Sequence, residues 1–170
     1  AEHITADIAI GLRCPINLAE RIKREYGSAM PDTLDKKEEI DVTELVKEEE
    51  VNDDISLISR KYVSEIINAR VEEIFEKVDN EFRKIDRSGM LPAGAIFVGG
   101  GASLDGLVES AKKKLRLPAA IGQAKNINVV IDKVKNPEFL TALGLVVWGS
   151  HTEGETSGGN KISRSLGGMF

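Results

Sequence analysis

The sequence predicts an α/β fold, and three observations support this prediction. Residues 60–86 carry apolar side chains at the roughly 3.6-residue period of an amphipathic helix, over about seven turns. Short apolar stretches at 95–98 and 118–121 alternate with helical patterns, as strands do in α/β chains. The composition, with 41% hydrophobic and 30% charged residues, is ordinary for a globular protein.

Two shorter helices are expected before the long one. The first covers about residues 3–13, and the second runs over about residues 16–26. Pro15 suits the first turn of the second helix, where no backbone donor is needed. Gly27 suits its C-terminal cap.

The segment that joins the second helix to the long helix is acidic and irregular. Weak strand patterns stand at 39–42 and at 54–58. The strongly acidic run 47–54 is expected to be a solvated loop or edge.

Shorter elements are expected after the long helix. A strand at 95–98 leads into consecutive glycines and then into a helix over about 104–115, with Ser103 as its N-cap. A second short strand is expected at 118–121. Both strands need partners, because a lone strand and helix cannot make a stable sheet.

The C-terminal part of the chain is expected to hold one more strand and one more helix. Residues 128–131 are apolar and predict a strand. Residues 136–149 predict a buried helix with Asn136 as its cap. From His151 onward the composition is typical of a flexible linker.

Charge and composition exclude several classes of protein. A net charge of −5 and a pI of about 5.2 argue against broad nucleic-acid binding, which needs a basic face. No run of about 20 apolar residues predicts a membrane span. The lone Cys14 cannot form an internal disulfide, and His3 and His151 have no cysteine cluster near them, so no structural zinc site is expected.

The segment "GAIFVGGGASLDGLVES" (94–110) raises the question of function. It runs an apolar strand into Gly99, Gly100 and Gly101 and then into a helix. Backbone N–H groups and a helix N-terminus at such a turn favour a phosphate or a nucleotide. The alternative is a tight strand-to-helix turn that binds no ligand.

The second helix carries a further pattern. Glu20, Lys23, Arg24 and Gly27 share one of its faces. This face is either the wall of a site for a ribose and a purine, or a solvated face held by ion pairs.

Together these motifs resemble the adenosine-binding half of the actin-like ATPase superfamily, and the whole chain resembles the C-terminal half of the FtsA family of bacterial division proteins. The segments that carry the resemblance are "HITADIAIGL", "AERIKREYG", "ISRKYVSEIINARVEEIFEKV", "FVGGGASLDGLVESA", "LPAAIG" and "NPEFLTALGL". Their joint order and spacing over about residues 2–149 are specific, although no single segment is.

The resemblance implies a fragment of an actin-like (ribonuclease H-like) ATPase fold. Residues 1–91 would be the outer subdomain of lobe II, and residues 92–149 would be the end of its inner subdomain. Residues 150–170 would be a flexible linker and the start of an amphipathic helix. The chain begins without an initiator Met, so we expect it to be a piece of a longer protein.

The resemblance also implies ATP with Mg²⁺ as the cofactor of the full-length parent. Glu20 and Lys23 would contact the ribose or the adenine edge, Gly27 would leave room for the base, and the glycines at 99–101 would line the other wall. The family's upstream phosphate-binding hairpin and first lobe have no counterpart in this sequence. We therefore expect no catalytic residue in this chain, and at most a weak ATPase in the parent.

Arg70 falls inside the apolar arc of the long helix, where a charge needs a partner. One interpretation is that it reaches outward from the edge of the core or pairs internally with Glu73 or Glu65. The other is that part of this apolar face is open and that Arg70 receives the carboxylate of a partner protein.

In the FtsA family the corresponding subdomain binds the C-terminal tail of FtsZ, which carries an acidic residue and apolar anchors. The resemblance therefore implies that Arg70 belongs to the FtsZ-tail site. Asn68, Arg60 and Lys61 are candidates for the same site because they are close in sequence.

The end of the chain carries apolar residues at helical spacing, namely Ile162, Leu166, Met169 and Phe170, with cations between them. The resemblance implies the start of a membrane-targeting helix, and so short a tail is expected to bind anionic membranes weakly. The alternative is a disordered end.

The resemblance implies a cell-division adaptor on the cytoplasmic face of the bacterial inner membrane, at the division site. Its parent would bind ATP, polymerise like actin and hold FtsZ. One alternative is an actin-fold adaptor of type IV pilus assembly, similar to PilM, and a weaker one is a lobe of a sugar kinase or a chaperone ATPase.

Overall fold

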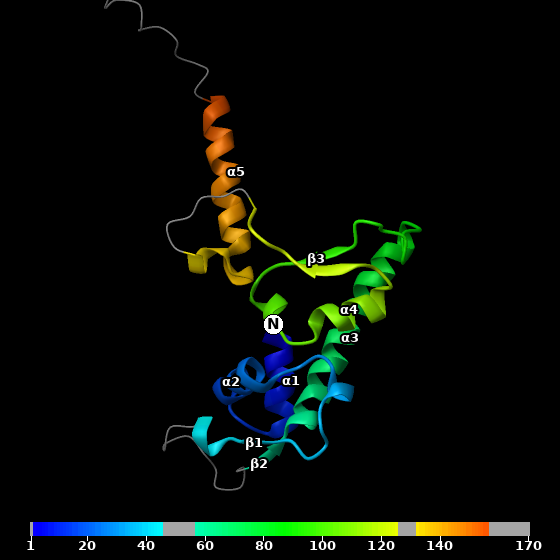
Figure 1. The fold of residues 1–170 in the computed structure, drawn as a ribbon, viewed down its shortest axis with the longest axis vertical. Helices are drawn as coiled ribbons and strands as arrows, with labels where there is room; N and C mark the ends of the chain where they lie inside the picture. The colour runs from blue at the N-terminus through cyan, green and yellow to red at the C-terminus, as the bar shows by residue number, and fades with distance from the viewer. Residues whose placement is uncertain (1, 46–56, 126–131, 157–170) are drawn as a thin grey trace, which may run out of the picture.

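The computed structural model describes residues 2–45, 57–125 and 132–156, and it confirms a mixed helix and sheet architecture (Figure 1). The helices and strands follow one another as α1 Glu2–Leu12, α2 Ile16–Tyr26, β1 Glu39–Asp41, β2 Leu57–Ser59, α3 Arg60–Lys84, β3 Ala95–Phe97, α4 Leu107–Leu115, β4 Ala119–Ile121 and α5 Leu140–Thr156.

Two small sheets lie near opposite ends of α3 (Figure 1). In the antiparallel sheet β1 pairs with β2, and Ile40 lies opposite Ile58. In the parallel sheet β3 pairs with β4, and Ile96 lies opposite Ala120. The predicted strands at 95–98 and 118–121 therefore pair with each other, which gives each of them a partner within the chain.

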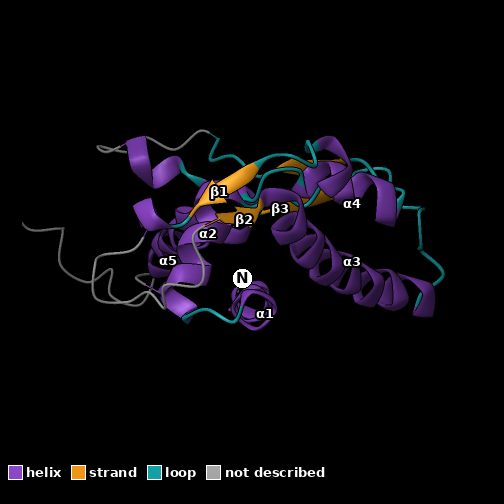
Figure 2. Ribbon diagram, turned by 90° about the horizontal axis from the view of Figure 1, so that it is seen from below, coloured by secondary structure: helices purple, strands orange, loops and turns teal. Residues whose placement is uncertain are grey.

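Helix α3 is the element against which the others pack. Its N-cap Ser59 accepts a hydrogen bond from the backbone N–H of Tyr62, which fixes where the helix begins. Figure 2 shows the strands on one side of the molecule and α1 on the other. Helices α1 and α4 both pack against α3, so its buried face has to be apolar along most of its length.

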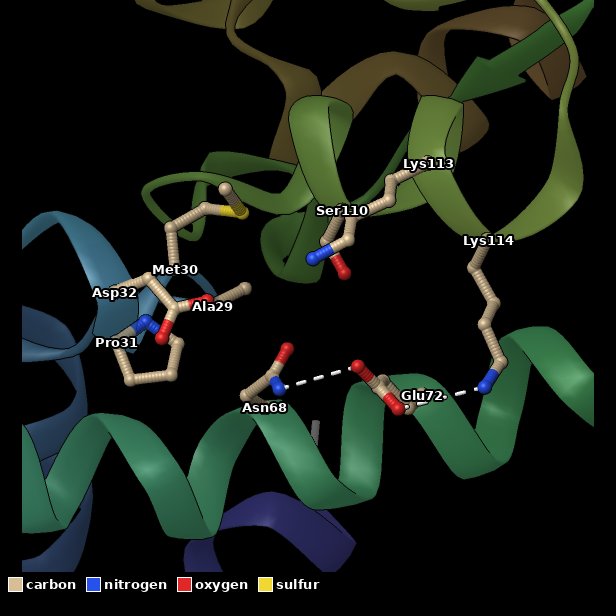
Figure 3. A pocket seen from close by; sticks show the side chains of 9 residues that line it. All are labelled: Ala29, Met30, Pro31, Asp32, Asn68, Glu72, Ser110, Lys113 and Lys114. Carbon is tan, nitrogen blue, oxygen red and sulfur yellow. Dashed lines mark hydrogen bonds and ion pairs between the residues drawn. The ribbon is translucent and has the colours of Figure 1, made fainter.

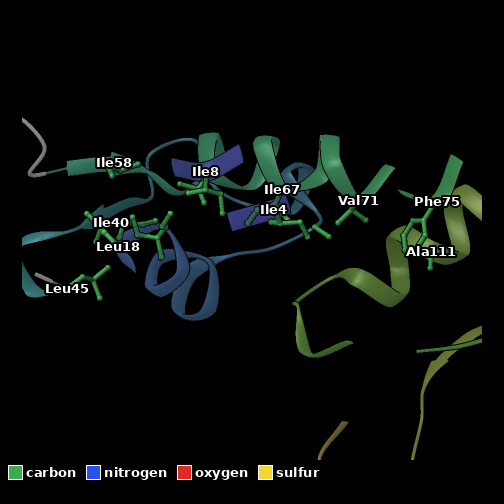
Figure 4. Close-up of a cluster of buried hydrophobic side chains, with 14 of the residues drawn as sticks. Ile4, Ile8, Leu18, Ile40, Leu45, Ile58, Ile67, Val71, Phe75 and Ala111 are labelled. Atoms are coloured by element: carbon green, nitrogen blue, oxygen red, sulfur yellow. The ribbon is translucent and has the colours of Figure 1, made fainter. Parts of the chain in front are cut away.

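The core runs along α3 from the antiparallel sheet to α4, as Figure 4 shows. The residues of α3 that face this core are Val63, Ile67, Val71 and Phe75, all of them buried. The aromatic ring of Phe75 lies 5.8 Å from that of Phe97 between centroids, so the core reaches the parallel sheet.

The predicted apolar face of the long helix is only partly buried. Ile74, Val78 and Ile85 are exposed in the structure, and α3 ends at Lys84. The helical period was right for the face as a whole, but it could not show how far the packing partners extend along that face.

A buried carboxylate fixes the turn that follows α3. The side chain of Asp79 is buried, accepts a hydrogen bond from the hydroxyl of Ser88 and forms an ion pair with Arg83 at 2.7 Å. The hydroxyl of Ser88 also accepts a hydrogen bond of 3.0 Å from Arg116. The hydrogen bond from Ser88 lowers the pKa of Asp79, which keeps the carboxylate charged for these partners.

Two helix starts differ from the predictions. Ser103 is not the N-cap of α4, because it ends a 3₁₀ turn, Gly100–Ser103, and α4 begins only at Leu107. Gly106 precedes α4 with φ at 70°, a conformation that glycine adopts without strain. Pro15 stands just before α2 rather than in its first turn.

The predicted buried helix at 136–149 is wrong in two respects. A 3₁₀ turn, Pro137–Phe139, comes first, and Asn136 makes no side-chain capping hydrogen bond. Helix α5 then projects from the body (Figure 1), so that Leu145, Val146 and Trp148 are exposed. It continues to Thr156, past the start of the predicted linker at His151.

Two other predicted segments, the loop at 47–54 and the strand at 128–131, lie outside the described residues. Within the described part of the chain, no helix has the length and apolar character needed to cross a membrane. The same part of the chain contains no cluster of side chains that could hold a metal ion.

The core predicts a clear difference between two isoleucines of α3. Ile67 is 0% exposed and Ile74 is 42% exposed. We expect Ile67→Ala to lower the free energy of unfolding by about 2–5 kcal/mol, because it leaves a cavity. Ile74→Ala, the matched control, is expected to cost less than about 1 kcal/mol. Urea denaturation measures both, and equal losses would contradict this description of the core.

Candidate functional site

Arg70 lies on the side of α3 that faces α1. The two helices run antiparallel here, since Asp7 of α1 meets Arg70 while Gly11 lies against Ile66. Arg70 donates from Nε to Oδ2 of Asp7 at 2.6 Å and from Nη2 to Oδ1 at 2.8 Å. Its Nη1 donates to Glu73 of the next turn. The guanidinium is therefore held by two carboxylates.

The four charges of this region form what we call the arginine cluster, made of Asp7, Arg70, Glu73 and Lys77. Lys77 donates to the other carboxylate oxygen of Glu73 at 2.6 Å. The hydrogen bond from Arg70 lowers the pKa of Asp7 against the opposing effect of burial, and the hydrogen bond from Lys77 lowers the pKa of Glu73. The hydrogen bond to Asp7 raises the pKa of Arg70. Asp7, Arg70 and Glu73 are thus charged near neutral pH, and the formal charges of the four residues sum to zero.

The structure confirms one part of the sequence interpretation of Arg70. It pairs internally with Glu73, as one alternative stated, whereas Glu65 is not among its partners. The sequence interpretation missed Asp7. The available signal was a lone carboxylate in the apolar first helix and a lone arginine in the apolar face of the long helix, because each requires a partner.

Apolar side chains stand on either side of Arg70 along α3. Ile66, Ile74 and Val78 follow at four-residue spacing from it, so they share its face of the helix. Ile66 is half-buried, whereas Ile74 and Val78 are exposed. We call this row of residues the α3 strip: an arginine with one half-buried and two exposed apolar neighbours on the side of α3 that faces α1.

The other partner-site candidates are not gathered around Arg70. Arg60, at the start of α3, donates from Nε to the carbonyl of Tyr26 at 3.0 Å and pairs with Glu38 at 2.6 Å. Lys61, next to it, is half-buried. Asn68 and Arg70 are two residues apart on a helix, so they project from different sides. The four candidates therefore do not form one cluster.

Asn68 instead lines a hollow of about 260 Å³ between α3, α4 and the 3₁₀ turn Pro31–Thr33 (Figure 3). It donates from Nδ2 to Glu72 at 3.3 Å, and Lys114 reaches the other oxygen of Glu72 at the same distance. Lys113 and Ser110 point into the hollow from α4. Both signs of charge line this surface, so it has no net preference for an anion.

The pair Glu20 and Lys23 of α2 is tied to α1. Lys23 donates from Nζ to the hydroxyl of Thr5 at 2.8 Å and forms an ion pair with Glu20, which also accepts a hydrogen bond from Thr5. Burial alone would raise the pKa of Glu20, but the hydrogen bonds from Lys23 and Thr5 outweigh it and lower the pKa. The predicted ion pair on this face is therefore present.

The glycines of the two predicted walls differ in their surroundings. A Cβ added to Gly27 would meet the carbonyl oxygen of Lys23 at 2.3 Å and Cδ1 of Ile67 at 2.9 Å. Packing against α3 therefore explains Gly27 without a ligand. A Cβ at any glycine of 99–101 would meet no atom of the described residues within 4 Å. Only at Gly99 does φ, at 89°, favour glycine, so the chain itself does not explain Gly100 and Gly101.

The segments that follow the two predicted walls, one after Gly27 and the other after the glycines of 99–101, contact each other in the structure. The residue after Gly27 forms a parallel bridge with the segment after the glycine turn, between Ser28 and Asp105. The N–H of Ala29 donates to the carbonyl of Asp105 at 2.8 Å. The segment that follows α2 and the segment that follows the glycine turn thus lie side by side. The predicted membrane residues Ile162, Leu166, Met169 and Phe170 lie outside the described residues.

Comparison with known proteins identifies the relatives of this chain. A family model described as "Cell division protein FtsA" matches residues 1–144. The cell division protein FtsA of Rhizobium meliloti (strain 1021) is 31% identical over 98% of this chain, and that of Neisseria meningitidis serogroup B (strain ATCC BAA-335 / MC58) is 37% identical over 84%. The FtsA of Bacillus subtilis (strain 168) is 32% identical over 85%.

The alignments cover 37%, 34% and 30% of these three relatives, respectively. The chain therefore spans about a third of the length of the curated relatives that it matches.

The arginine cluster predicts a pH-dependent contribution to stability. The pKa of Asp7 lies below its ordinary value of 3.8 in the folded chain, so its stabilising effect is present above that value and is lost as pH falls through the folded pKa. We expect Asp7→Asn to lower the thermal unfolding midpoint at pH 7 by several degrees, and we expect the gap from the wild type to narrow progressively as the pH falls below 3.8.

The matched control for this measurement is Asp32→Asn. Asp32 is exposed and has no hydrogen-bond or ion-pair partner through its side chain among the described residues. Its substitution is expected to leave the midpoint unchanged at pH 7. A gap between Asp7→Asn and the wild type that stays constant however far the pH falls below 3.8 would contradict an ionic role for Asp7.

Proposed function

The chain belongs to the FtsA family of cell division proteins, and we propose that it is the part of such a protein that binds the C-terminal tail of FtsZ. The observation that carries this proposal is the α3 strip, in which Arg70 stands among exposed apolar side chains. A tail with an acidic residue and apolar anchors complements this surface, because a guanidinium binds a carboxylate and the apolar neighbours bury the anchors.

Arg70 is the central residue of the proposed tail site. Asn68 projects from another side of α3 and lines the hollow, while Arg60 is engaged by Glu38 and a backbone carbonyl. Lys61 has no hydrogen-bond or ion-pair partner through its side chain among the described residues. We therefore propose a tail site centred on Arg70, with Lys61 and the other two residues at its margin.

We also propose that the full-length parent binds ATP with Mg²⁺ and that this chain supplies part of the adenosine side of the site. The open space around the glycines of 99–101 fits a ligand that approaches the backbone closely. Glu20, half-exposed, would face the ribose or the adenine edge beside Lys23. The bound nucleotide would fix the two lobes of the parent relative to each other. The residues that hold phosphate and Mg²⁺ would come from parts of the parent outside this chain.

The remaining features belong to the proposed parent as a whole. We propose that it assembles like actin, that its C-terminal residues bind the cytoplasmic face of the inner membrane, and that it tethers FtsZ there at the division site. The named relatives are cell division proteins, so they support this proposal and give no support to the pilus-assembly alternative.

The tail-binding proposal is tested by fluorescence anisotropy with a labelled FtsZ C-terminal tail peptide. We expect saturable binding to this chain and an affinity about tenfold or more lower for Arg70→Glu, because the charge reversal repels the acidic residue. Arg70→Lys keeps the charge but loses the planar fork, so an intermediate loss is expected.

The control for the tail measurement is Arg87→Glu, since Arg87 is exposed on the turn after α3 and has no side-chain partner in the described part of the chain. Its affinity for the peptide is expected to equal that of the wild type within about twofold. Circular dichroism shows whether each variant is folded. A folded wild-type chain that does not bind the peptide would remove the proposal.

The nucleotide proposal is tested in the full-length parent. Gly101→Val is expected to reduce ATP affinity about tenfold or more, because the new side chain fills space that the proposed nucleotide needs. Gly144→Val, in α5, is the control, since a Cβ there also meets nothing within 4 Å in the described part of the chain. Isothermal titration calorimetry measures both variants, and equal affinities would overturn the assignment of the glycine turn.

A further inference from the structure

We infer that Glu73 occupies the position on Arg70 that the partner's carboxylate takes, and that Asp7 is a positioning residue that stays in place when the partner binds. This inference rests on the proposed tail site. It adds that an internal carboxylate, that of Glu73, already occupies the site. An acidic tail binds by displacing Glu73 from Arg70, and this exchange sets the affinity for the tail.

The hydrogen bonds to Arg70 distinguish the two carboxylates. Asp7 engages the guanidinium with both of its oxygens, at Nε and at Nη2. This arrangement fixes the plane of the guanidinium. Glu73 accepts from Nη1 alone. The contact with Glu73 is thus the one that a second carboxylate can replace without disturbing the orientation of Arg70.

Burial separates the same two residues. The side chain of Asp7 is 25% exposed and that of Glu73 is 42% exposed. Asp7 is short and comes from α1, so the packing of α1 on α3 holds it in position. Glu73 has a longer side chain on α3 itself, and it can rotate away from Arg70 into solvent without any movement of the backbone.

Lys77 provides a second partner for Glu73. It donates to the Glu73 oxygen that does not contact Arg70. When Glu73 leaves Arg70, its charge therefore keeps an ion pair, and the exchange does not leave an uncompensated carboxylate. Lys77 is mostly exposed and can follow Glu73 outward.

Charge explains why the exchange limits affinity. The arginine cluster is neutral, so an approaching carboxylate experiences no net attraction from it. Replacing Glu73 by an uncharged residue gives the cluster a net positive charge and removes the ion pair at Nη1. We therefore expect Glu73→Gln to bind the acidic tail about three- to tenfold more tightly at low salt. We expect this gain to shrink as salt is added.

The experiment is anisotropy with the labelled FtsZ tail peptide, titrated with the wild-type chain, Glu73→Gln and Glu76→Gln. Glu76 lies on the same helix, is exposed and has no side-chain partner among the described residues, so its substitution controls for overall charge. A second peptide, with its acidic residues replaced by amides, is titrated in parallel. Tighter binding by Glu73→Gln alone, and only to the acidic peptide, is the expected result.

A second variant acts in the opposite direction. Lys77→Gln removes the alternative partner of Glu73 and leaves that carboxylate on Arg70, so weaker binding of the acidic peptide is expected. Lys84→Gln is its control, because Lys84 forms an equivalent ion pair with Glu81, also at 2.6 Å, near the end of α3.

The outcomes separate this inference from the proposed function. If the wild-type chain binds and Arg70→Glu does not, but Glu73→Gln equals Glu76→Gln or binds more weakly than the wild type, Glu73 is not an internal occupant. In that case the proposed tail site is retained and the inference about Glu73 is rejected. If neither the wild type nor any variant binds while all are folded, the tail site and this inference fail together.

Discussion

The structure depends on the burial of one face of α3. Val63, Ile67, Val71 and Phe75 lie on this face and are buried by elements that precede and follow α3 in the chain. Helix α1 covers part of the helix, α4 covers another part, and each small sheet lies near one of its ends. None of the short strands could persist alone, so their positions follow from the packing on α3.

The same packing explains the arginine cluster. Bringing α1 against α3 places Arg70 at the edge of the core, where its charge is costly unless a carboxylate accompanies it. Asp7 supplies that carboxylate from α1, and Glu73 adds a second one from α3. The cluster thus joins two helices and also sets the charge of the surface between them. In the proposed tail site, stability and recognition would depend on the same guanidinium.

The helical periods in the sequence predicted α1, α2 and α3 to within about two residues at each end. They could not predict Asp7 as the partner of Arg70, because a period shows which face is buried but not which helix covers it. Helix α5 was predicted to be buried because it is rich in apolar residues, and it is exposed. Apolar composition indicates that a surface is suited to burial. It does not show which other element or chain, if any, buries that surface.

The glycines differ in whether contacts within the described chain account for them. Gly27 is required by its own helix and by Ile67, so packing alone accounts for it. At Gly100 and Gly101 a side chain would meet no atom of the described chain, and neither has a backbone conformation that favours glycine. Packing among the described residues therefore gives no reason for glycine, with its entropic cost, at these two positions. Leu145, Val146 and Trp148 of α5 are likewise exposed, and both features lie in the part of the chain that follows α3.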